Sequence, residues 1–200
     1  MHKNGVATLV GFLALSAISI ALISGIVLWA LPNIQKAQNQ DEAMRIENRM
    51  IELHNTIKIA ANEQTKLSVP FYIKKGRLAL STNGTENNSV IFTSNLKLPV
   101  PYNQRVLLGN KTEVGILGVD EPAYAIESGA FELKLHYIML NDTATKDCYR
   151  IQLKHGIQSA IGPGDHTIAI RWDSEINDQD LATHSGCYRN ITQVVLIDMV

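Results

Sequence analysis

The alternation of apolar and polar residues divides the chain into three parts. After a short polar start, an apolar stretch runs from Val6 to Leu31 without one charged residue. As an α-helix rising 1.5 Å per residue, this stretch would be roughly 37 Å long, which is enough to cross a bilayer with some tilt. It is also longer than the roughly 7–15 apolar residues of a cleaved secretory signal. The pattern therefore predicts one membrane-spanning helix that stays on the protein.

The polar sequence after this stretch predicts that the helix continues with a narrow apolar seam, to about Gln64. The seam residues recur at alternating spacings of three and four, at Ala43, Ile46, Met50, Leu53, Ile57 and Ala60. So narrow a stripe predicts one contact, either with the rest of this chain or with the helix of a neighbouring copy. We expect packing on the chain's own domain. Pro32 should kink or restart the helix at the lipid–water boundary, and Pro70 should keep it from continuing further.

Beyond Pro70, short alternating runs broken by Gly, Asn and Pro predict a β-rich domain. The candidate strands are Phe71–Ile73, Arg77–Leu80, Val90–Thr93, Arg105–Leu108, Glu113–Leu117, Tyr124–Glu127, Phe131–Met139, Tyr149–Leu153, Thr167–Trp172 and Gln193–Met199. Strands at this spacing favour an antiparallel sandwich or curled sheet. The predicted fold class is α+β, with a long N-terminal helix before an antiparallel β-sandwich-like domain. We expect a leader at 1–5, a transmembrane helix at 6–31, an outer helix at 32–65 and an extracellular β-rich domain at 66–200.

Cysteines and glycosylation sequons favour an extracellular position for the β-rich part. Cys148 and Cys187, the two cysteines of the chain, are either two buried thiols or a disulfide worth about 4 kcal/mol on the chain-entropy model. The membrane anchor and the sequons favour the disulfide. Five Asn-x-Ser/Thr sequons occur, none of them before residue 65, at Asn83, Asn87, Asn110, Asn141 and Asn190.

Charges flanking the apolar stretch weakly favour a position of the β-rich part inside the cell. Lys3 precedes it, whereas Lys36, Arg45 and Arg49 follow it, and positive residues usually stay inside the cell. The counts are small, so we expect the C-terminal domain outside. Within the stretch, serine hydroxyls should donate to backbone carbonyls. Small residues follow one helical face and either promote close helix packing or reflect ordinary membrane-helix composition, at Ala14, Ala17, Ala21 and Gly25.

Motifs for catalysis, nucleotide binding and metal binding are weak or missing. A net charge of −1 does not provide the basic field that nucleic-acid binding needs. The acidic run that begins at Asp173 starts like an EF-hand loop, but Asp178 stands where the turn needs Gly and His184 where the bidentate Glu belongs. A solvated loop is expected there, rather than a weak calcium site. The run Lys74–Arg77 reads as a solvated edge. We therefore predict no enzymatic activity, cofactor or metal.

A short leader stands before the apolar helix, Lys3-Asn4-Gly5, followed by Val6-Ala7-Thr8-Leu9-Val10-Gly11. Together with the retained helix and its heptad continuation, it resembles the N-terminus of type IV pilin-like proteins, particularly the archaeal ones. The segments Phe71–Leu80 and Ser89–Thr93 are similar to the first hairpin of some of these proteins. The resemblance implies cleavage by a prepilin peptidase between Gly5 and Val6. Asn4 departs from the basic residue that is usual before this glycine.

The resemblance implies a function in assembly. The chain would be a structural subunit, major or minor, of an extracellular type IV pilin-like filament that polymerises through its apolar helix. Its partners would be copies of itself or related pilins, the prepilin peptidase and, before assembly, the membrane. Before assembly it would be a single-pass membrane protein with the C-terminal domain outside. The alternative is a single-pass membrane-anchored extracellular binding domain that does not polymerise.

Overall fold

The computed structural model describes residues 3–82, 88–96, 104–107, 122–127, 130–137, 140–141, 147–177 and 187–200. The chain divides into two compact units, Met1–Glu42 and Ala43–Val200. One helix, α1 (Lys3–Asn62), contributes to both units.

In the first unit, α1 continues through Pro32 without a break, so the helix does not restart there. A proline removes one backbone donor, and the remaining backbone hydrogen bonds of the helix can form on both sides of it. The side chain of Asn33 adds a bond one turn back, with Nδ2 donating to the carbonyl of Trp29 at 3.0 Å. The predicted junction between the apolar and polar parts is therefore helical throughout.

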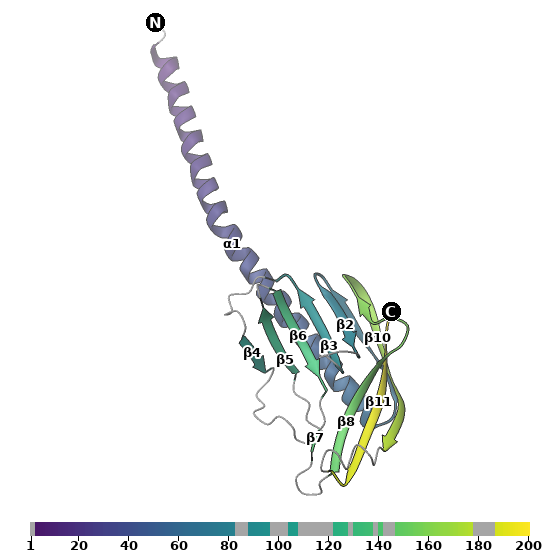
Figure 1. Ribbon diagram of the computed structural model, residues 1–200. Helices are drawn as coiled ribbons and strands as arrows, with labels where there is room; N and C mark the ends of the chain where they lie inside the picture. The colour runs from purple at the N-terminus through teal and green to yellow at the C-terminus, as the bar shows by residue number, and fades with distance from the viewer. Residues whose placement is uncertain are drawn as a thin grey trace. The chain divides into compact units, whose positions relative to one another are not determined.

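The second unit contains two β-sheets (Figure 1). The five-stranded sheet has the order β1 (Lys66–Ile73), β10 (Gly164–Asn177), β11 (Arg189–Met199), β8 (Asp147–His155) and β7 (Leu140–Asn141). The six-stranded sheet has the order β4 (Gln104–Leu107), β5 (Pro122–Glu127), β6 (Ala130–His136), β3 (Ser89–Ser94), β2 (Arg77–Ser81) and β9 (Ala160–Ile161). This arrangement confirms the predicted α+β class.

Among the described strands, one pair departs from the antiparallel pattern. β8 and β11 run parallel, with Asn190 opposite Cys148 and Ile197 opposite His155. β10 lies between them in the chain and runs antiparallel to β11. Because β8 and β11 point the same way and β10 points the opposite way, β10 ends at the edge of the sheet where β8 begins. β11 begins at this same edge.

Most of the predicted strands occur in the structure. β8, β10 and β11 extend beyond the residues expected for them, because the paired backbone continues past the clearest apolar alternation. The two-residue strands β7 and β9 were not predicted, since two residues carry no periodicity. The candidate strand Glu113–Leu117 lies outside the described residues.

The outer part of α1 supplies one side of the hydrophobic core. All six predicted seam residues are buried, and they share one apolar cluster with residues from both sheets. Among the sheet residues in this cluster are Phe71, Phe92, Leu133, Ile170 and Ile197. The prediction that the seam packs on the chain's own domain is therefore confirmed.

Candidate functional site

The first unit presents an exposed apolar surface along α1. Over residues 11–34, the large apolar side chains are between 45% (Val27) and 75% (Leu28) exposed. The helix is long and apolar enough to cross a membrane. A helix that is apolar on all sides is stable only in lipid or among other apolar helices. This segment therefore requires a lipid or protein environment.

The hydroxyls of two serines in this segment are satisfied by the helix itself. The hydroxyl of Ser16 donates to the carbonyl of Phe12, and that of Ser19 donates to the carbonyl of Leu15, both at 2.9 Å. These bonds confirm the predicted role of the two serines. On the small-residue face, a Cβ added at Gly25 would meet nothing within 4 Å, so this position is open to a neighbouring helix.

The predicted leader bond lies close to the start of the helix. α1 begins at Lys3, so the backbone of Gly5 and Val6 is already helical. Cleavage between these two residues would leave nearly all of α1 on the mature chain.

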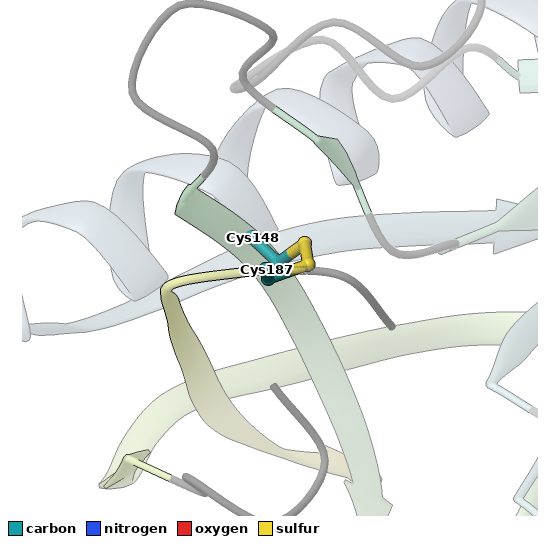
Figure 2. Close-up of a disulfide and its surroundings, with 2 residues drawn as sticks. All are labelled: Cys148 and Cys187. Carbon is teal, nitrogen blue, oxygen red and sulfur yellow. A yellow bond between two sulfur atoms is a disulfide. The ribbon is translucent and has the colours of Figure 1, made fainter. Parts of the chain in front are cut away.

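The predicted disulfide is present between Cys148 and Cys187 (Figure 2). Cys148 is the second residue of β8, and Cys187 comes just before β11. Their Cα atoms are 5.8 Å apart, and the bond closes a separation of 39 residues. It thus ties together the starts of the two parallel strands. A loop of this size corresponds to about 4 kcal/mol on the chain-entropy model.

The five predicted glycosylation sites have different outcomes. Asn83, Asn87 and Asn110 lie outside the described residues, and Asn141 lies in the short strand β7. Asn190 is only 1% exposed. A sugar chain needs an exposed acceptor, so this burial argues against a glycan on Asn190 in the folded domain. The sequon does not reveal that β11 is an inner strand, flanked by β10 and β8.

The acidic run from Asp173 does not form the expected loop over its described part. Residues 173–177 belong to β10, and their carboxylates already have partners. Asp173 pairs with the ammonium of Lys154 at 3.5 Å, and Glu175 accepts a hydrogen bond from Gln193 Nε2 at 2.7 Å. An extended strand cannot wrap around a calcium ion as an EF-hand loop does. Residues 178–184, which include the other expected ligand positions, lie outside the described residues.

A buried polar junction was not predicted from the sequence. Asn88, at φ +63°, donates through Nδ2 to the carbonyls of Tyr137 and Ile151 at 2.6 and 2.7 Å. Its Oδ1 accepts from the backbone N–H of Leu153 at 2.6 Å. Asn88 therefore joins β8 of one sheet to the ends of β3 and β6 in the other. The available sequence signal was the tolerance of Asn for left-handed backbone, which does not specify a partner.

The comparisons with known proteins identify no relative. No protein-family model, curated protein or solved structure matches this chain.

Proposed function

We propose that this chain is a structural subunit, major or minor, of an extracellular type IV pilin-like filament. The observation that carries the proposal is the uncharged, exposed apolar surface over residues 11–34 of α1. This surface belongs to the same helix that supplies the core seam of the β-rich domain. The prepilin-like leader ending at Gly5 supports the same assignment through its resemblance to this family. The function is assembly, and the chain catalyses no reaction.

The apolar surface suits both a membrane and a filament. Lipid tails and apolar helices are similarly apolar, so replacing lipid neighbours with protein neighbours costs little. The segment anchors the subunit in the membrane first and then packs against other copies or related pilins. Head-to-tail contacts that do not close into a ring produce a helical filament.

The apolar segment over residues 11–34 is the part of α1 that remains available for assembly. The seam from Ala43 to Ala60 is already buried in the chain's own core, so it is not available to a neighbouring helix. The buried disulfide suits an oxidising compartment and supports placing the domain outside the cell. The prepilin peptidase and the membrane are the partners before assembly.

The test is the mass of the N-terminal peptide of protein recovered from its native membranes. The proposal requires a peptide that begins at Val6, which means that the leader is removed and the apolar helix is kept. A peptide that begins at Met1 or His2 would contradict it. That outcome would favour the alternative, an anchored extracellular domain that does not polymerise.

A further inference from the structure

The turn between β1 and β2 forms one wall of a pocket in the second unit. The pocket has a volume of about 590 Å³, within the range of about 300–1,000 Å³ that holds small ligands. None of the described residues that line it is acidic. The lining side chains that could contact a ligand are Lys74, Lys75, Arg77, Thr93, Asn95 and Pro163.

The backbone of this turn is held in place against β3. Gly76 has φ +125°, and a Cβ there would lie 2.5 Å from the carbonyl oxygen of Thr93 and 2.7 Å from the ring of Phe92. Only glycine allows so close an approach in this conformation. The buried Ser94 also donates from Oγ to the carbonyl of Lys75 at 3.0 Å. The lysines therefore project from a fixed turn, which lowers the entropic cost of binding.

The pocket carries positive charge that no described carboxylate neutralises. Lys74 and Lys75 are exposed, as is Arg77 at the start of β2, and none of the three forms an ion pair within the described residues. In register, Arg77 lies opposite Thr93, which lies opposite Glu132 on β6. Glu132 is therefore two strands away from Arg77, and it makes an interaction of its own. Three cations thus gather at one pocket of a chain whose net charge is −1.

We propose that this pocket binds a soluble ligand that carries two or more oxyanionic groups, phosphates or sulfates. Ammonium and guanidinium groups form charge-assisted hydrogen bonds to such oxygens, and the guanidinium can bind two of them at once. The Thr93 hydroxyl and the Asn95 amide supply further donors. The pocket exceeds the size of a single oxyanion, so several charged groups fit the three cations better than one. This proposal does not depend on filament assembly.

The experiment is isothermal titration calorimetry on the full-length protein in an uncharged detergent. The probes are inorganic tripolyphosphate and a sulfated heparin-type hexasaccharide, which separate a phosphate source from an acidic-sugar source. The double variant Lys74→Gln/Lys75→Gln should weaken binding of the preferred probe by at least about tenfold, because charge-assisted hydrogen bonds are lost. Raising the salt concentration should also weaken binding of the probe to the wild type, because salt screens the attraction between the cations and the oxyanions.

The matched control is Lys66→Gln/Arg171→Gln. These two exposed cations lie opposite each other on β1 and β10, outside the pocket, and the double variant removes the same charge. It should change the affinity for the probe by less than about twofold, because it alters the overall electrostatic field of the protein and leaves the cations of the pocket in place. Failure of both probes to bind at millimolar concentration would overturn the proposal. Equal losses in the two double variants would also overturn it, since net charge alone would then explain the binding.

Discussion

Asn88 connects the two sheets through side-chain hydrogen bonds that no other residue type could make in the same backbone conformation without strain. We expect Asn88→Ala to lower the free energy of unfolding by about 3–5 kcal/mol. The substitution leaves two buried carbonyls and one buried N–H without this partner and places an alanine at φ +63°. Urea unfolding of the full chain in uncharged detergent, followed by tryptophan fluorescence, measures the change.

Two controls separate the causes at this position. Asn88→Gly removes the hydrogen bonds but tolerates the positive φ, so it should still lose most of the stability. Asn48→Ala, at an exposed position of α1, should change the stability by less than about 0.5 kcal/mol. If Asn88→Gly were as stable as the wild type, the hydrogen bonds would not matter.

Glu47, on the outer part of α1, provides a prediction for pH dependence. Partial burial raises the pKa of its carboxyl above the ordinary value. The folded state therefore binds this proton more tightly than the unfolded chain does, and the resulting stabilisation is lost as the pH rises through the folded pKa. Glu47→Gln should raise the urea midpoint slightly at pH 7 and leave it unchanged at about pH 3, where the carboxyl is protonated in both states. A lower midpoint for this variant at pH 7 would show that the ionised carboxylate stabilises the fold.

At the scale of elements, the outer part of α1 is held by a stripe of side chains rather than by helix propensity. Ile57 is fully buried in the core, whereas Ile59, two residues later on the same helix, is 43% exposed. Ile57→Ala should lower the free energy of unfolding by about 2–5 kcal/mol, because it removes a packed side chain and leaves a cavity. The measurement is the same urea titration.

The same substitution at Ile59 is the matched control. Ile59→Ala should cost less than about 1 kcal/mol, since alanine favours the helix and the side chain lies partly in water. Similar losses at the two positions would mean that a partner also covers the exposed face of the helix. In that case the outer part of α1 would form an interface with a partner in addition to packing on its own domain.

At the scale of the whole molecule, the proposed assembly depends on removal of the leader. Gly5→Leu should block cleavage and abolish surface filaments, because the resemblance places the peptidase site at this glycine. The measurements are the mass of the N-terminal peptide and electron microscopy of cells that express the variant. Gly11→Leu, the same substitution six residues later, should leave cleavage unchanged. Normal filaments formed by the Gly5→Leu variant would contradict the proposed route of assembly.

The sequence alone determined the features that follow from local periodicity and chain chemistry. The uncharged stretch from Val6 predicted an apolar helix, and all six residues that the three-four spacing identified are buried, although His54 and Ala61 are buried beside them without having been predicted. Alternating runs predicted most strands, because the side-chain period of two is a local property. The cysteine pair and the membrane-type helix together favoured the disulfide, which the structure contains.

Only the tertiary structure decided the features that depend on neighbours distant in the chain. The parallel pairing of β8 with β11 follows from the path of β10, and the burial of Asn190 follows from the place of β11 inside its sheet. The run from Asp173 was expected to form a loop because polar residues dominate it, yet pairing with β11 makes its described part, 173–177, a strand. Lys74 and Lys75 are exposed, as predicted for a solvated edge, but only the tertiary structure places them beside Pro163 and the end of β3, where these residues line one pocket. Pairing, burial and enclosure are set by contacts between distant residues, and local sequence patterns do not specify those contacts.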